Sequence, residues 1–333
     1  MELLRSKCIL AVATLALVLG GAAATYGLLR PLTSPAPDAP IATPLSTRVA
    51  ALTPADVGAV AALDTLGRAG TLGTLGTFGT LGAFGAAGTT PQQTYGGYAG
   101  YRGAILSHGG GLRDFYFTRG IFSDWRGYGR RGRSAWDTDY PKADRQFLWG
   151  LKRLTNIDAY DSENAILLTD PDLRRYPFLY MLEVGSMQLT PPEVEGLRDY
   201  LAAGGFLFID DFWGARQWDN FEWEIHNVLP GSQIVELPAD HPLFSTFYVI
   251  DEILQVPNIS IAYNPNGPTW EYGGYVPHVR AIFDERDRLI VLINWNTDLG
   301  DAWEWAEDPY YPLEYSTYAY QIAINAIIYS MSH

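Results

Sequence analysis

The chain has 333 residues, of which 47% are hydrophobic, so it can form one large domain or two smaller ones with a tail. Its formal charge is −14, and such an acidic chain excludes a broad nucleic-acid-binding surface, which needs basic side chains to neutralise phosphates. Cys8 is the only cysteine, which excludes an intramolecular disulfide, a cysteine-based zinc site and a thiol nucleophile beyond the amino-terminal segment.

Residues 1–24 are predicted to be an export signal. Arg5 and Lys7 precede the apolar run from Cys8 to Ala24, which ends in small residues that suit a signal peptidase. An uncleaved membrane anchor is the alternative, because the run is just long enough to span a bilayer. In either case we expect the rest of the chain to be exported, and to be periplasmic or anchored in the inner membrane facing the periplasm.

Residues 25–112 are predicted to be a low-complexity tether. The stretch from Pro31 to Pro54 is rich in Pro, Ala, Thr and Ser, which is typical of a solvated linker. Glycine then recurs at every third position from Gly70 to Gly88, but the repeat lacks the proline of a collagen triple helix. A flexible tether is therefore favoured over an ordered glycine-rich assembly, and the folded domain is expected to span residues 113–333.

The stretch from Thr190 to Gly214 is the clearest structural signal. Thr190 and Glu193 form a capping box that starts a helix, and Gly204-Gly205 supplies the left-handed stop that ends it. The following apolar run, Phe206 to Asp210, is typical of a strand covered on both faces.

The surrounding pattern predicts an α/β fold: a mostly parallel central sheet flanked by helices, with an added antiparallel hairpin. The other strands are expected at 114–122, 165–169, 177–182 and 233–237, the hairpin at 279–283 and 289–293, and further helices from Tyr140-Pro141, at 216–229 and at 317–330. Two stretches are expected to be loops: residues 251–278, a long excursion and candidate lid, and residues 294–305. The basic cluster 126–133 is read as a surface loop or, alternatively, an anion contact.

Polar side chains at the strand ends are the candidate ligand site, because open α/β sheets bind ligands at the carboxyl ends of their strands. Adjacent aspartates point to opposite sides of a strand, and we favour Asp210 for the site and Asp211 for a cap. The candidates are Arg119, Asp170, Glu183, Asp210, Asp211, His241, Asn294, Asp298 and Asp301.

The chemistry of this site is open at the level of sequence. Asp210, His241 and a loop acid could bind a metal, but they lack diagnostic spacing, so we assign no metal site, no cofactor and no catalytic residue. Ser186 lacks the G-x-S-x-G frame of a hydrolase nucleophile. The tryptophans of residues 294–305 suit a sugar or peptide ligand, or alternatively fill the core.

Several motifs resemble those of the bacterial family catalogued as domain of unknown function 4159, over residues 114–330. They are DYPKAD (Asp139 to Asp144), DPDL (Asp170 to Leu173), YPFLYM (Tyr176 to Met181), LRDYLAAGGFLFIDDFWG (Leu197 to Gly214) and DHPLF (Asp240 to Phe244). The resemblance implies a class I glutamine amidotransferase-like, flavodoxin-type fold. It does not carry amidotransferase activity over, because the folded region has no cysteine nucleophile.

The leading functional hypothesis is a non-catalytic, envelope-facing module that binds a ligand or acts as a scaffold. The alternative is a hydrolase, metal-assisted or not, that acts on a carbohydrate or cell-wall substrate through Asp210, His241 and Asp298. The partners we expect are a carbohydrate or peptide ligand and a membrane-associated protein complex, with no nucleic acid.

Overall fold

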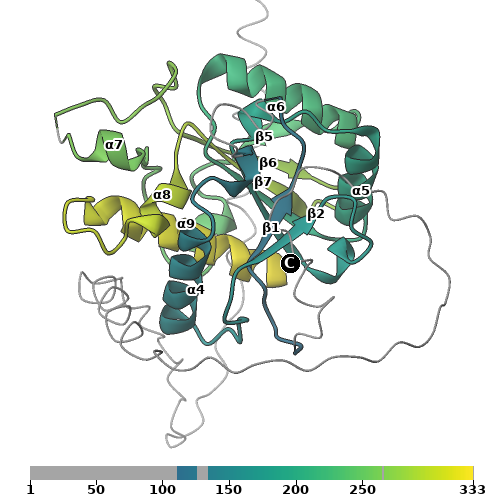
Figure 1. Cartoon of the computed structure of the whole chain (residues 1–333), viewed down its shortest axis with the longest axis horizontal. Helices are drawn as coiled ribbons and strands as arrows, with labels where there is room; N and C mark the ends of the chain where they lie inside the picture. Colours follow the sequence, from purple (N-terminus) through teal and green to yellow (C-terminus); the bar gives the residue numbers. More distant parts are fainter. Residues whose placement is uncertain (1–110, 126–133, 265, 333) are drawn as a thin grey trace, which may run out of the picture. The chain divides into compact units, whose positions relative to one another are not determined.

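The computed structural model describes residues 111–125, 134–264 and 266–332 (Figure 1). The expected export signal, nearly all of the expected tether and the basic cluster 126–133 lie outside these residues. Within the described part of the chain, no helix combines the length and hydropathy needed to cross a membrane.

The described residues form a seven-stranded sheet in the order β2-β1-β3-β4-β7-β6-β5. Pairing from β2 through to β7 is parallel, and β7, β6 and β5 pair antiparallel. The predicted mostly parallel α/β sheet with an antiparallel hairpin is therefore confirmed. The strands are β1 Thr118–Ile121, β2 Asn164–Leu167, β3 Phe178–Leu182, β4 Phe206–Asp210, β5 Ile234–Glu236, β6 His278–Phe283 and β7 Leu289–Trp295.

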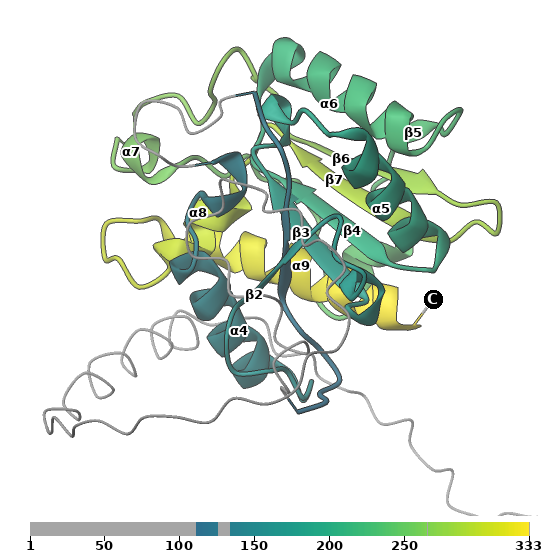
Figure 2. The same ribbon diagram turned by 45° about the vertical axis from the view of Figure 1, so that its right-hand side comes forward.

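Helices cover both faces of the sheet (Figure 2). One face carries α5 and α6, and the other carries α4, α8 and α9. The helices are α4 Lys142–Leu154, α5 Pro191–Ala202, α6 Gly214–Val228, α7 Ile259–Ala262, α8 Leu299–Glu304 and α9 Leu313–Ser332, with short 3-10 turns η4 Val184–Ser186 and η5 Pro242–Ser245 among the connections.

The two faces make two hydrophobic cores, because successive strand residues point to opposite sides. Along β4, Phe208 packs into the core beneath α4, α8 and α9, while Leu207 and Ile209 pack against α5 and α6. Every residue of β4 is buried, which explains why its sequence is a continuous apolar run without alternation.

The local signals around α5 produce the predicted structure. Glu193 Oε2 accepts hydrogen bonds from the amide (2.8 Å) and the hydroxyl (2.7 Å) of Thr190 at the start of the helix. Gly204 ends it with φ +96°, a conformation that favours glycine. The chain then enters β4, which pairs in parallel with β3 and β7.

Two predictions of irregular structure are wrong in part. Residues 294–305 do not form a plain loop, because Asp298 accepts a hydrogen bond from the amide of Asp301 (2.8 Å) and so starts α8. The excursion at residues 251–278 contains the short helix α7. The first strand is also shorter than expected, since Phe115 makes only an isolated bridge to Ala159 before β1 begins.

Candidate functional site

A cleft of about 860 Å³ lies where the parallel strands β3, β4 and β7 end. This edge is where open α/β sheets bind ligands. The floor consists of acidic residues that follow the three strands or precede α4, and α6, the 251–278 excursion and the segment after β1 supply the walls. The lining residues that carry the argument are Asp139, Glu183, Asp211, Asp298 and Asp301 on the floor, and Trp125, Arg216, Asp219, Asn220, Trp223, Asn258 and Tyr272 on the walls.

Three carboxylates from different elements meet on the floor, and we call them the carboxylate cluster. Asp139 precedes α4, Asp211 follows β4, and Asp298 begins α8, yet one oxygen of each lies within 4.8 Å of the others. Asp139 also comes within 4.8 Å of Asp301 and Glu304 on α8. Such a set of oxygen atoms matches the ligands that hard divalent cations prefer.

Unusual backbone geometry presents these carboxylates. Asp139, Glu183 and Asp211 have φ values of 60°, 52° and 48°, in the left-handed region that residues other than glycine rarely adopt. The amide of Glu183 donates a hydrogen bond of 3.0 Å to the carbonyl of Asp211, which ties the ends of β3 and β4 together. Of the six positive-φ residues other than glycine in the described chain, four line the cleft, a concentration typical of functional sites.

Burial and mutual repulsion raise the pKa of each member of the carboxylate cluster well above its ordinary value. Burial is the largest cause for all three; the next is the charge of Asp301 for Asp139, of Glu183 for Asp211 and of Asp211 for Asp298. Asp211 and Asp298 are buried and Asp139 is half-buried, and three carboxylates this close are not all ionised without compensation, so either protons or a cation must neutralise them.

The hydrogen bonds of the cluster leave room for a ligand atom. Asp211 Oδ1 accepts from the indole nitrogen of Trp213 (2.9 Å). In contrast, Oδ2 of Asp139 is buried and has no hydrogen-bond partner among the described residues. A side chain at Gly300 would place its Cβ 2.9 Å from this oxygen, so only glycine fits there without displacing Asp139.

Asp210 faces away from the cleft and is fully buried. Its Oδ1 accepts from the amide of Leu299 (3.2 Å), and its Oδ2 accepts from the amide of Gly300 (3.0 Å) and the hydroxyl of Tyr180 (2.9 Å). The two adjacent aspartates do point to opposite sides, but Asp211 lines the cleft and Asp210 caps α8, the reverse of our expectation.

Arg119 and Asn294 are buried beneath the cleft and do not line it. Arg119 pairs with Asp144 (Nε to Oδ1, 3.2 Å) and donates to the carbonyls of Trp136 and Thr138, immediately before Asp139. It therefore holds the segment that carries Asp139. The side-chain amide nitrogen of Asn294 donates a hydrogen bond to the backbone carbonyl of Ile209 (2.9 Å).

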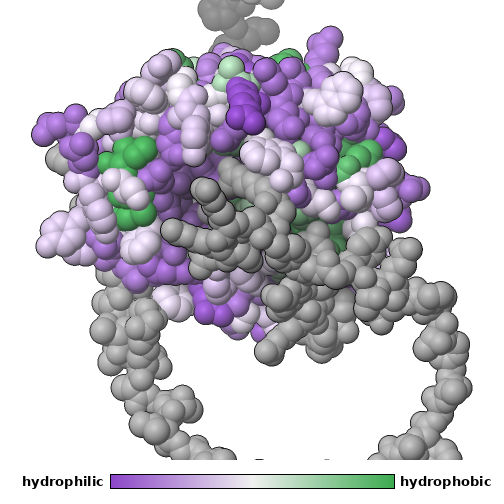
Figure 3. Space-filling model, turned by 45° about the horizontal axis from the view of Figure 1, so that its top comes forward, coloured by the Kyte–Doolittle hydropathy of each residue, from purple (hydrophilic) through white to green (hydrophobic). Residues whose placement is uncertain are grey.

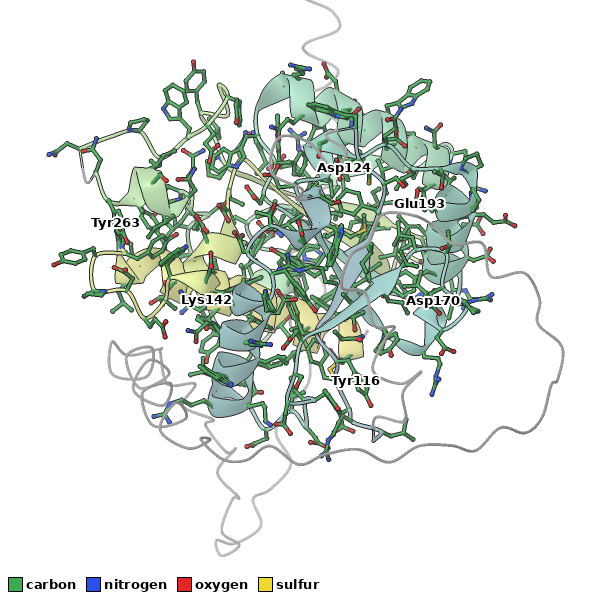
Figure 4. The ribbon with its side chains drawn as sticks, viewed as in Figure 1. Tyr116, Asp124, Lys142, Asp170, Glu193 and Tyr263 are labelled. Atoms are coloured by element: carbon green, nitrogen blue, oxygen red, sulfur yellow. The ribbon has the colours of Figure 1, made fainter. Side chains whose placement is uncertain are left out.

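Asp170 and His241 lie away from the cleft. Asp170 Oδ1 accepts from the amide of Asp172 (2.9 Å) in a turn, on the side of α5 in Figure 4. His241 Nδ1 accepts from the amide of Leu243 (3.2 Å) at the start of η5, and its ring packs near Phe283. Of the nine predicted site residues, the structure thus brings four to the cleft: Glu183, Asp211, Asp298 and Asp301.

None of the three tryptophans of residues 294–305 lines the cleft. Trp303 is fully buried in the core, Trp295 stacks on His278 with 5.0 Å between ring centroids, and the ring of Trp305 lies 4.1 Å from the ammonium of Lys142. The aromatic residues of the cleft come from other elements, and no local sequence pattern predicts that they gather there. They are Trp125, Trp213, Trp223 and Tyr272.

A comparison with curated proteins found no match. The family model described as "Domain of unknown function (DUF4159)" matches residues 127–331, which is more than half of the chain and includes most of the described domain. The chain therefore belongs to the DUF4159 family.

Proposed function

We propose that the cleft is the active site of a hydrolase that uses a divalent cation held by Asp139, Asp211 and Asp298. The observation that carries the proposal is the unpartnered, buried Oδ2 of Asp139 beside two further buried carboxylates. A cation would satisfy that oxygen and would remove the repulsion that raises the pKa of all three groups. An all-oxygen set favours Mg²⁺, Ca²⁺ or Mn²⁺ over zinc or copper.

The neighbouring acids could supply the proton transfers of such a reaction. A cation held by Asp139, Asp211 and Asp298 would supply Lewis acidity at the cleft floor, and a nearby carboxylate would accept the proton of the water that attacks the substrate. Burial raises the pKa of Glu304, whose carboxylate comes within 4.8 Å of Asp139, so this side chain can store the proton that the leaving group takes, although it does not itself line the cleft. The water oxygen and one of its protons end on one product, its other proton goes to the carboxylate, and the leaving group takes the proton that the acid releases.

The strand order supports a proposed kinship with class I glutamine amidotransferase-like, flavodoxin-type domains. Flavodoxin-type sheets run in the order 2-1-3-4-5, and here β2-β1-β3-β4 is followed by β7 in the fifth place. The left-handed Glu183 directly follows β3 and lines the cleft. We further propose that residues 1–24 direct the chain to the periplasmic face, that residues 25–112 tether the domain, and that it works within a membrane-associated complex.

A non-catalytic ligand-binding module is the second candidate. It is favoured by Asp301, whose oxygens both accept hydrogen bonds, from the amide of Ile259 (2.7 Å) and the indole nitrogen of Trp305 (3.2 Å). Part of the acidic floor therefore already has structural partners. A module of this kind would bind the cation and a ligand without turnover.

Calorimetric titration of the full chain with Mn²⁺ tests the proposal. We expect the unmodified protein to bind Mn²⁺. In Asp211→Asn or Asp298→Asn the affinity should fall by more than about 100-fold, which exceeds the loss caused by removing a residue that only orients a metal ligand. Asp219→Asn is the matched control, because Asp219 lines the same cleft outside the cluster. Absence of Mn²⁺ binding, or equal affinity in all variants, would refute the cation site. Binding without chelator-sensitive hydrolysis would favour the second candidate.

A further inference from the structure

One face of α6 forms a wall of the cleft. Arg216, Asp219, Asn220 and Trp223 all line it, at positions i, i+3, i+4 and i+7 of the helix. The helix begins at Gly214, three residues after Asp211, so the wall leads away from the carboxylate cluster. Trp223 lies nine residues beyond Gly214, about 13 Å along the helix axis.

Large aromatic side chains stand exposed around the rim. Trp223 is 69% exposed, Tyr272 73% and Trp125 53%, although each lines the cleft. Aromatic surface of this kind usually packs in a core or against a ligand. The face drawn in Figure 3 is mostly hydrophilic, with its hydrophobic residues in small separate patches, which does not suggest a broad protein-docking surface there.

The charge of the cleft limits the ligands that it can accept. Among the described lining residues, seven carry carboxylates, and Arg216 carries the sole positive charge. A polyanion such as a nucleotide or a sulfated polymer would be repelled by this lining. The guanidinium of Arg216 lies 5.9 Å from the ring centroid of Trp125. This ring already makes a cation–π contact within the protein, which disfavours a cationic ligand there.

We infer that the substrate of the cleft is a neutral glycan chain, which stacks a sugar ring on Trp223 and extends toward the carboxylate cluster. The inference rests on the proposed function, since it identifies the substrate class of the same site. Sugar rings present apolar faces that pack on indoles, and their hydroxyls can donate to the side-chain oxygen of Asn220, whose amide nitrogen donates to the carbonyl of Met187. The distance along α6 makes Trp223 a distal subsite, which only a chain of several sugars can reach.

The position of Trp223 gives the proposal a specific test. Binding of neutral β-1,4-linked hexasaccharides of N-acetylglucosamine, glucose and mannose to the full chain is measured by calorimetry, together with the corresponding disaccharides. We expect at least one hexasaccharide to bind. Trp223→Ala should lower the affinity for it about tenfold, which is the contribution of one stacked ring. Disaccharide binding near the cluster and Mn²⁺ affinity should not change.

Trp149→Ala is the matched control, because Trp149 is an exposed tryptophan of α4 that does not line the cleft. The inference is overturned if no neutral hexasaccharide binds, or if the Trp223→Ala and Trp149→Ala variants bind the hexasaccharide equally well. It is also overturned if spermine or a polygalacturonate oligomer binds more tightly than every neutral hexasaccharide. Glycan binding that survives Asp211→Asn, in a protein that binds no Mn²⁺, would support the glycan subsite and refute only the hydrolase.

Discussion

The hydroxyl of Tyr180 on β3 donates a hydrogen bond of 2.9 Å to Oδ2 of Asp210 at the end of β4. The same carboxylate accepts hydrogen bonds from the backbone amides of Leu299 and Gly300, so one buried group fixes the first turn of α8 against the sheet. Because α8 also carries Asp298 at its start, Asp210 sets the position of the carboxylate cluster without lining the cleft.

Asp210→Asn should therefore destabilise the protein, because both oxygens of a carboxyl group, protonated or not, can accept hydrogen bonds from α8, whereas an amide nitrogen cannot accept any. At pH 5.5 we expect a loss of about 1–3 kcal/mol in the free energy of unfolding, from a buried α8 amide left without an acceptor. Tyr180→Phe, which removes a single donor, should cost about 1 kcal/mol. Urea denaturation measures both, and a midpoint unchanged in Asp210→Asn would contradict this role.

Stability of the cation-free protein should fall as the pH rises through neutrality. Burial raises the pKa of Asp210 to about 7, so the folded state binds this proton more tightly than the unfolded state does. The stability that the proton confers is complete below the ordinary pKa and is lost as the pH rises through about 7. Melting temperatures at pH 5 to 8 should show this fall, and the deficit of Asp210→Asn should be smaller at pH 8 than at pH 5.5. An equal deficit at both values would contradict the assignment.

Local signals account for the parts of the fold that were predicted correctly. Thr190 with Glu193, Gly204 and the apolar run of β4 act through neighbours in the sequence, so they can be read without tertiary structure. The phase of β4 could not be read, because a strand buried on both faces has no polar alternation to indicate which aspartate faces outward.

Asp139 was missed for a different reason. It precedes a helix, whereas the predicted site residues lie at strand ends and in the turns and loops beyond them. It reaches the cleft only because Arg119, far away in the sequence, holds the carbonyls of Trp136 and Thr138. Only tertiary contacts place it beside Asp211 and Asp298.

Gly300→Ala should weaken cation binding without changing any charge. Its Cβ would lie 2.9 Å from Oδ2 of Asp139, closer than real Cβ contacts, and 3.1 Å from the hydroxyl of Tyr180, which is tight. Asp139 must then move, and we expect Mn²⁺ affinity to fall by about 10-fold or more, as for a disturbed ligand shell. Gly111→Ala is the control, since its Cβ would meet nothing within 4 Å. Equal affinities in the two variants would argue against Asp139 as a ligand.

Arg119→Met should be strongly destabilising, because it leaves the buried Asp144 without its partner. Both side chains of this ion pair are fully buried, and breaking such a pair costs about 3–5 kcal/mol. The double variant Arg119→Met/Asp144→Leu should recover much of that loss, since it removes the stranded charge. Arg113→Met provides the exposed comparison, because Arg113 and Asp158 form a solvent-accessible pair worth less than about 1 kcal/mol.

The same variants separate a general loss of stability from a specific effect on the site. Arg119 also fixes the segment that precedes Asp139, so the double variant should bind Mn²⁺ more weakly than the unmodified protein even where its stability is restored. Denaturation and calorimetry on the same samples measure the two effects independently. If the double variant recovers both stability and Mn²⁺ affinity, Arg119 serves the core alone; if affinity stays low, the positioning of Asp139 depends on the guanidinium.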